Sequence, residues 1–207
     1  MRSIVLILFC CLASVASVCQ SEETKLLARQ DRVFTIYTEA HGLTDSGEST
    51  LILAIRKDGQ AIWSENRING GGQYRIGQVE PKKVEALLER LNQDGLFVDK
   101  DLLRGHFGPD SSFTTILVES GKQKVKMQSW HELAEANGGI ATEIGLVGGK
   151  DSRLAVLKKS SSKYLHYRLV WSELRVQLSD LLPADSRPLN GGHIKMKGGE
   201  VFWVLDN

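Results

Sequence analysis

The distribution of cysteine constrains this chain more than any other feature of its sequence. All three cysteines, Cys10, Cys11 and Cys19, lie in an apolar segment at the start of the chain. If that segment is removed, the remaining chain has no cysteine, or one if Cys19 remains, so no internal disulfide forms. Its stability must then come from burial of an apolar core. Thiol catalysis, cysteine-ligated zinc and iron–sulfur clusters are excluded with the cysteines.

The first 19 residues have the order of parts that is typical of a secretory signal peptide. A positively charged start is followed by an apolar run over residues 4–12, and then by the small residues Ala13, Ser14, Ala16 and Ser17. A membrane helix is the alternative, but the uncharged run is barely as long as the roughly 20 residues that span a bilayer. We therefore expect a cleaved export signal and a periplasmic or extracellular protein. The rules for cleavage allow a cut after Ala16, after Ser17 or after Cys19.

Lipidation of Cys19 is a second route to a membrane. A bacterial lipoprotein signal places a small residue before the modified cysteine, whereas Val18 precedes Cys19. The pattern favours an unmodified protein, which would contact a membrane only if the leader were retained or Cys19 were lipidated.

Length and charge indicate one globular domain without affinity for nucleic acid. We interpret residues 20–30 as a flexible leader and 31–207 as a single domain, which is long enough to bury a core. The whole chain has 26 Lys and Arg against 25 Asp and Glu. This balance provides no positive field for nucleic acid.

The clearest hairpin spans residues 50–65. Asp58 and Gly59 predict a two-residue turn with positive φ at both positions, which places Ile55 opposite Ile62. In that register one core-facing surface carries four residues: Leu51, Leu53, Ile55 and Ile62.

Alternating side chains and turn residues predict strands or hairpins in three further segments. Residues 32–40 alternate like a strand. Residues 111–128 predict a hairpin that turns at Ser120-Gly121, with Ile116 and Val118 on the face of Val125 and Met127, and with Glu119 opposite Lys122. Residues 193–205 predict a third hairpin. Its lysines, and those of 122–126, are interpreted as a solvated strand face. The glycine run in 69–77 predicts a flexible turn or bulge and not a phosphate-binding loop.

Two amphipathic helices are expected, near 80–94 and 162–182. In the first, Pro81 suits the first turn and Gly95 suits a left-handed C-terminal cap. The apolar stripe of the first helix is Val84, Leu87, Leu88 and Leu91. Ser161 or Ser162 can cap the second helix. The stripe of the second is Tyr167, Val170, Trp171, Leu174, Leu178 and Leu181, and we interpret Trp171 as a core residue. Between the helices, "HELAEANGG" from 131 predicts a helical turn and "SRLAVLKK" from 152 predicts a short strand.

No motif in the chain identifies a reaction. The five histidines do not have the His-x-x-x-His spacing that places two metal ligands on one helix face, and no Gly-x-Ser-x-Gly elbow is present. We expect no catalytic residue and no cofactor. A metal site assembled through folding would draw on His41, His106, Asp110, His131 and Glu132.

The segment 50–128 resembles a bacterial envelope domain family of unknown function. The resemblance rests on "LILAIRKDGQAIWSE", "GGQYRIGQVEPKKVEALLERLNQDGLF" and "FTTILVESGKQKVKM", which are a hairpin, a glycine-bearing strand with a helix, and another hairpin. It implies a topology and an exported setting, and it implies no catalytic residue.

Together these patterns predict an exported α+β domain in which an antiparallel sheet of hairpins packs against two amphipathic helices. The leading functional hypothesis is a non-enzymatic binding or structural module of the bacterial envelope, with an unidentified protein or envelope component as its partner. The alternatives are a metal-assisted hydrolase that uses the dispersed histidines and carboxylates, and an inhibitor or regulator of an exported enzyme that presents a sheet edge.

Overall fold

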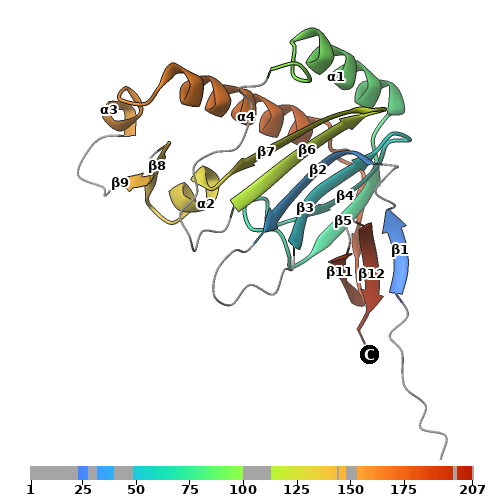
Figure 1. The fold of residues 1–207 in the computed structure, drawn as a ribbon. Helices are drawn as coiled ribbons and strands as arrows, with labels where there is room; N and C mark the ends of the chain where they lie inside the picture. Colours follow the sequence, from blue (N-terminus) through green and yellow to red (C-terminus); the bar gives the residue numbers. More distant parts are fainter. Residues whose placement is uncertain are drawn as a thin grey trace, which may run out of the picture.

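The structure is a computed structural model of the chain. It describes residues 23–27, 32–39, 49–99, 113–143, 145–147, 153–197 and 200–206. Helices pack against antiparallel sheets, so the predicted α+β fold class is confirmed (Figure 1).

The main sheet has seven antiparallel strands, and the first hairpin lies in its middle. Its strands, in spatial order, are β10 (Ser186–Leu189), β5 (Tyr74–Gln78), β4 (Gln60–Ser64), β3 (Ser49–Arg56), β2 (Arg32–Glu39), β6 (Phe113–Ser120) and β7 (Gln123–Ser129). The central strands are buried on both faces, which explains their long apolar runs.

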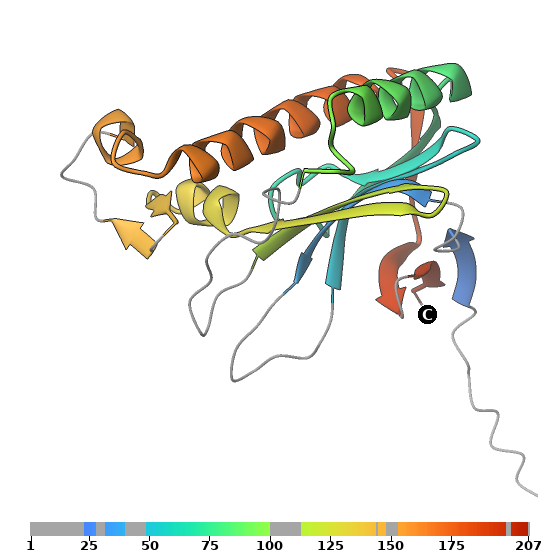
Figure 2. The ribbon, with the colours of Figure 1, turned by 45° about the horizontal axis from the view of Figure 1, so that its top comes forward.

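Two helices cover one face of this sheet, as the sequence predicts (Figures 1 and 2). They are α1 (Pro81–Gln93) and α4 (Ser162–Asp180). Val84 and Leu87 of α1 share one buried cluster with Trp171 and Leu174 of α4. Trp171 is therefore the core residue that its position on the stripe predicts. Among the described helices, none is long and apolar enough to span a bilayer.

The ends of both helices match their sequence signals. The Leu96 N–H donates to the Leu91 carbonyl at 2.9 Å, and Gly95 has φ +84°, so α1 ends in a Schellman motif. Leu96 is buried in the core beyond that turn. At the start of α4, the Ser161 hydroxyl accepts from the Tyr164 N–H at 3.2 Å.

A three-stranded sheet covers part of the opposite face of the main sheet. Its order is β1 (Glu23–Leu27), β12 (Glu200–Leu205) and β11 (Gly192–Lys197). Leu51 and Ile62 of the main sheet pack with Val201 of the small one. The hairpin predicted at 193–205 is confirmed. The flexible leader predicted at 20–30 is corrected, because β1 lies within it and pairs with β12.

The predicted register of the first hairpin is wrong by one residue. Ile62 lies opposite Ala54, not Ile55, and the loop has three residues, 57–59. Gly59 has φ +88°, whereas no non-glycine residue has positive φ among those described. Asp58 therefore does not adopt the conformation that a two-residue turn requires, and the longer loop forms instead.

A β-bulge in β3 moves Leu51 to the other face of the sheet. Ile36 lies opposite Leu53, but the next residue, Tyr37, lies opposite Leu51, so Ile52 is the extra residue. Leu53 and Ile55 face the helices, whereas Leu51 and Ile62 face the small sheet. The single face predicted for these four residues is therefore divided between the two sides.

The second hairpin has the predicted faces and a shifted register. Ile116 pairs with Met127 and Val118 with Val125 on the helix side, as expected. Glu119 lies opposite Lys124 and not opposite Lys122, and their side chains form an ion pair at 3.4 Å. The turn is Gly121-Lys122, because φ of +60° at Gly121 suits the first position of a type II′ turn.

The segment between the second hairpin and α4 forms a small satellite of short elements. They are α2 (His131–Ala136), β8 (Ile140–Thr142), β9 (Gly145–Val147) and α3 (Arg153–Leu157). The predicted helical turn is confirmed as α2, but the strand predicted from residue 152 is wrong. The Lys158 N–H bonds the Leu154 carbonyl at 3.1 Å, so this segment is a helical turn anchored by buried Val156.

Candidate functional site

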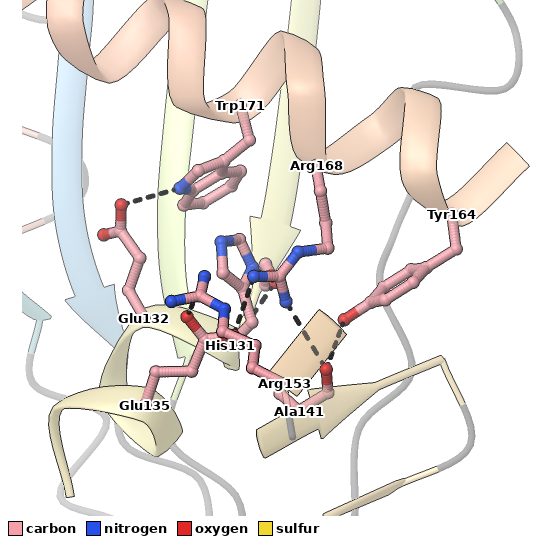
Figure 3. A network of polar contacts seen from close by, with 9 residues as sticks. His131, Glu132, Glu135, Ala141, Arg153, Tyr164, Arg168 and Trp171 are labelled. Carbon is pink, nitrogen blue, oxygen red and sulfur yellow. Dashed lines mark hydrogen bonds and ion pairs between the residues drawn. The ribbon is translucent and has the colours of Figure 1, made fainter. Parts of the chain in front are cut away.

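A cluster of charged groups lies where α2 and β8 meet the N-terminal half of α4 (Figure 3). Side chains from α2, α3 and α4 converge there on the carbonyl of Ala141 and on two carboxylates. Because this cluster holds the two described residues of the predicted metal site, His131 and Glu132, it is the place to test that prediction.

Glu135 is held by two arginines from different helices. Its Oε1 lies 2.7 Å from Nη2 of Arg168 on α4, and its Oε2 lies 2.7 Å from Nη2 of Arg153 on α3. The Arg168 side chain is 10 % exposed, so its charge requires this partner. Both oxygens of Glu135 are thereby engaged in ion pairs.

Arg168 also contacts β8 and an aromatic ring. Its Nη1 donates to the Ala141 carbonyl at 3.4 Å, and the Tyr164 hydroxyl donates to the same carbonyl at 3.4 Å. The guanidinium carbon lies 5.8 Å from the centre of the Tyr164 ring, within cation–π range. Burial raises the pKa of Tyr164, so its hydroxyl stays protonated as a donor.

His131 is sealed inside the cluster. It is 4 % exposed, its Nδ1 hydrogen-bonds the Ser129 hydroxyl, and its ring meets Trp171 edge-on with centroids 5.4 Å apart. Burial, with a smaller effect of the charge on Arg168, lowers the pKa of His131 to about 3. The imidazole is therefore neutral at physiological pH.

Glu132 forms hydrogen bonds with partners that differ from those of Glu135 and His131. Its Oε1 accepts from Nε1 of Trp171 at 2.9 Å and from Nε of Arg175 at 3.0 Å. Arg175 in turn donates to the Arg67 carbonyl at 2.6 Å, which ties α4 to the loop between β4 and β5. Glu132 thus links α2, α4 and the main sheet through one carboxylate oxygen.

The structure does not bring the described candidate ligands together around one point. Although His131 and Glu132 are adjacent in the chain, their side chains bond separate partners. Within the described ranges, no group of three or more metal-binding side chains occurs. His41, His106 and Asp110 lie outside the described residues.

The pair formed by Ser129 and His131 has the elements of a nucleophile and its base, but not their accessibility. Ser129 is 1 % exposed and Trp171 covers the imidazole, so a substrate cannot reach the hydroxyl. The arrangement joins α2 to the end of β7 and stabilises the fold. Both oxygens of Glu135 are paired, whereas Glu132 Oε2 and Arg175 Nη1 are buried without a hydrogen-bond partner.

Sequence reasoning missed the arginines that organise this cluster. Arg168 lies on the buried side of α4 between Tyr164 and Trp171. A cation inside an apolar stripe is a signal for a buried acidic partner, and it was present in the sequence. The identity of that partner, Glu135, depends on contacts across 33 residues.

The described surface also offers several hollows and an apolar stripe. One hollow of about 420 Å³ lies between α1 and α4, beside Leu87 and Leu181. Another of about 390 Å³ lies between β11 and the glycine run, beside Gly72 and Tyr74. The stripe follows the outer face of α4 and contains Leu165, Leu169 and Val176.

Comparison of the chain with protein-family models, with curated protein sequences and with solved structures found no match. The candidate site therefore rests on the geometry alone.

Proposed function

We propose that this chain is an exported, non-enzymatic binding module of the bacterial envelope, and that the outer face of α4 contacts a protein partner. The observation that carries the proposal is the apolar stripe on that face. Leu169 is 56 % exposed and Val176 is 59 % exposed, and Leu165 extends the stripe by one turn. Contiguous apolar surface that faces water is typical of interaction sites.

The stripe has the spacing of a helix-packing surface. Leu165, Leu169, Ser172 and Val176 follow one another at intervals of four, three and four residues, so they share one side of α4. The opposite side of the same helix carries Trp171, Leu174 and Leu178, which are fully buried. The core therefore does not require the outer residues to be apolar, and a partner helix that buries them explains their composition.

The charged cluster supports the same proposal because it fixes α4 against the rest of the domain. α2 binds α4 through Glu132 and Glu135, as Figure 3 shows, and the Arg67 carbonyl of the β4–β5 loop accepts a hydrogen bond from Arg175 of α4. A rigid helix loses little conformational entropy when it binds, which favours α4 as a docking surface.

The experiment compares the unmodified mature chain with Leu169→Glu in a pull-down from envelope extract. Val98→Glu is the matched control, because Val98 is 75 % exposed and lies outside α4. We expect a defined partner that is recovered with the unmodified chain and with Val98→Glu and is lost with Leu169→Glu. Circular dichroism melting should show that both variants remain folded.

Two results would overturn the proposal. One is recovery of the same proteins with Leu169→Glu as with the unmodified chain. The other is turnover in a broad hydrolase screen that a single substitution abolishes. Stoichiometric zinc in the purified protein would favour the metal-assisted hydrolase.

A further inference from the structure

The described part of the chain contains five dipeptides in which glycine follows asparagine or aspartate. They are Asn69-Gly70, Asn137-Gly138, Asn190-Gly191, Asp58-Gly59 and Asp94-Gly95. In such a dipeptide the glycine nitrogen can attack the carbonyl carbon of the preceding side chain, because glycine has no Cβ that obstructs the approach. All five glycines have positive φ, between +73° and +88°. The value of φ therefore does not distinguish one dipeptide from another.

Hydrogen bonding of the glycine N–H does distinguish them. Four of the five glycines donate to a backbone carbonyl earlier in the chain, at 3.0 or 3.1 Å. These bonds run from Gly59 to Arg56, from Gly70 to Asn66, from Gly95 to Asn92 and from Gly138 to Glu135. The Gly191 N–H has no acceptor among the described residues. A nitrogen whose N–H already donates must first lose that bond, so Gly191 provides the most available nucleophile of the five.

The asparagine residues show the same contrast. Nδ2 of Asn137 donates to the Leu133 carbonyl at 2.8 Å, and the Asn69 carbonyl accepts from the Thr38 hydroxyl at 3.1 Å. Asn190 is exposed, and its side chain has no hydrogen-bond partner within the described ranges. Its Cγ can therefore approach the next nitrogen by rotation of the side chain, and water reaches the product.

We propose that Asn190 is the asparagine at which the folded protein deamidates, and that this reaction changes the connection between its two sheets. The Gly191 nitrogen loses its proton to hydroxide and bonds to Cγ of Asn190. The bond from Cγ to Nδ2 breaks, and the departing nitrogen takes a proton from water and leaves as ammonia. Water then opens the succinimide ring at either carbonyl, which leaves aspartate or isoaspartate at position 190. This inference does not depend on the function proposed for α4.

The position of Asn190 gives isoaspartate a structural effect. Asn190 and Gly191 are the whole connection between β10 of the main sheet and β11 of the small one. Both ends of this connection are fixed. Leu189 pairs with Tyr74, and a Cβ on Gly192 would lie 2.3 Å from the Val204 oxygen of β12. Isoaspartate lengthens the main chain of this short connection by a carbon atom, so we expect the adjacent end of the small sheet to loosen.

The test compares three asparagines that have the same following residues. Asn69, Asn137 and Asn190 are each followed by two glycines, so their reactivity in an unfolded chain is matched. The full mature chain is incubated in mildly alkaline buffer, and peptide mapping by mass spectrometry measures the acid formed at each position. Breaking one hydrogen bond first slows a reaction by roughly fivefold, so Asn190 should react at least about fivefold faster than the other two. In denaturing urea the three rates should become similar.

Two variants assign the reaction to its residue. Asn190→Gln should abolish the release of ammonia by the folded protein over the time in which the wild type reacts, because glutamine must close a larger ring. Asn137→Gln is the matched control, and it should leave the release of ammonia unchanged.

Hydrogen exchange tests the effect on the small sheet. The aspartate and isoaspartate forms of the wild type are separated by chromatography, and their amide exchange is compared. We expect faster exchange at Val204 and at Asp206, whose N–H donates to the Gly191 carbonyl at 3.1 Å, in the isoaspartate form alone.

Three results would contradict the proposal. In the folded protein, Asn69 or Asn137 could react as fast as Asn190, or Asn190 could stay intact while the urea-unfolded chain reacts. Either result overturns the assignment of the site. Equal exchange in the two product forms overturns the effect on the connection between the sheets.

Discussion

Arg168 of α4 and Glu135 of α2 form an ion pair at 2.7 Å, and the second oxygen of Glu135 binds Arg153 of α3 at the same distance. One carboxylate thus connects three helices. Because the Arg168 side chain is 10 % exposed, the loss of its partner leaves a charge that water cannot fully solvate.

The first prediction concerns this carboxylate. We expect Glu135→Ala to lower the free energy of unfolding by about 3 kcal/mol, since breaking one partner of a largely buried ion pair has costs of this order. Urea denaturation at pH 7 measures the change. The double variant Glu135→Ala with Arg168→Met should recover more than half of the loss, because no isolated charge remains.

The control for that variant is Glu89→Ala on the exposed side of α1. It should change stability by less than about 0.5 kcal/mol, as exposed substitutions usually do. Equal effects of Glu89→Ala and Glu135→Ala would contradict the role assigned to the cluster.

The second prediction concerns pH. The pKa of His131 is lowered to about 3 by burial, whereas that of an unfolded histidine is about 6.5. The unfolded chain therefore binds this proton first as the pH falls, and stability declines from pH 6.5 towards pH 3. The decline from this residue is about 1.4 kcal/mol for each pH unit in that window.

The measurement compares the wild type with His131→Asn, which does not titrate. Between pH 7.5 and 4.5 the wild type should lose roughly 2.5 kcal/mol more than the variant in urea denaturation. Proton NMR should show no titration of the His131 ring above pH 4. A midpoint near 6.5 would show that the ring is accessible to water.

The third prediction separates two glycines that both have positive φ. A Cβ on Gly59 would lie 2.0 Å from the Val79 carbonyl oxygen, whereas a Cβ on Gly121 would have no atom within 4 Å. Gly121→Ala should cost about 1 kcal/mol from backbone strain alone. Gly59→Ala should cost clearly more, about 3 kcal/mol, because the backbone must also move. Similar costs in thermal or urea melts would contradict the three-residue loop.

The fourth prediction concerns the leader. We expect the native protein to lack Met1 and to begin after Ala16, Ser17 or Cys19. Intact mass spectrometry gives the start, and a thiol assay should find one free cysteine at most. An intact Met1 would overturn export, and a mass increase on Cys19 would indicate lipidation.

Local patterns predicted the elements whose residues interact with near neighbours in the chain. Val84, Leu87 and Leu91 share one side of α1 because the helical repeat brings them together, and Gly95 ends the helix by its own backbone preference. The face shared by Ile116 and Met127 was predictable in the same way, since side chains alternate in every strand.

The strand register of the first hairpin was predicted wrongly because the structure contains one extra residue in the loop and one in a β-bulge. The loop at Gly59 has one residue more than the two-residue turn, and the bulge at Ile52 adds another to β3. Each shift of one residue exchanges the two faces of a strand, so Leu51 and Ile62 moved to the small sheet. Nothing local to these residues indicates which face is buried.

The sequence by itself determined the α+β class, the two long helices and the absence of cysteine from residues 20–207, because these follow from composition and short-range periodicity. Only the tertiary structure decided that Glu135 meets Arg168, that Glu132 meets Arg175, and that β1 joins β12. Those pairings join residues that are 33, 43 and more than 170 positions apart. The packing of whole helices and strands determines which of these residues meet. Local sequence patterns carry no information about contacts over such separations.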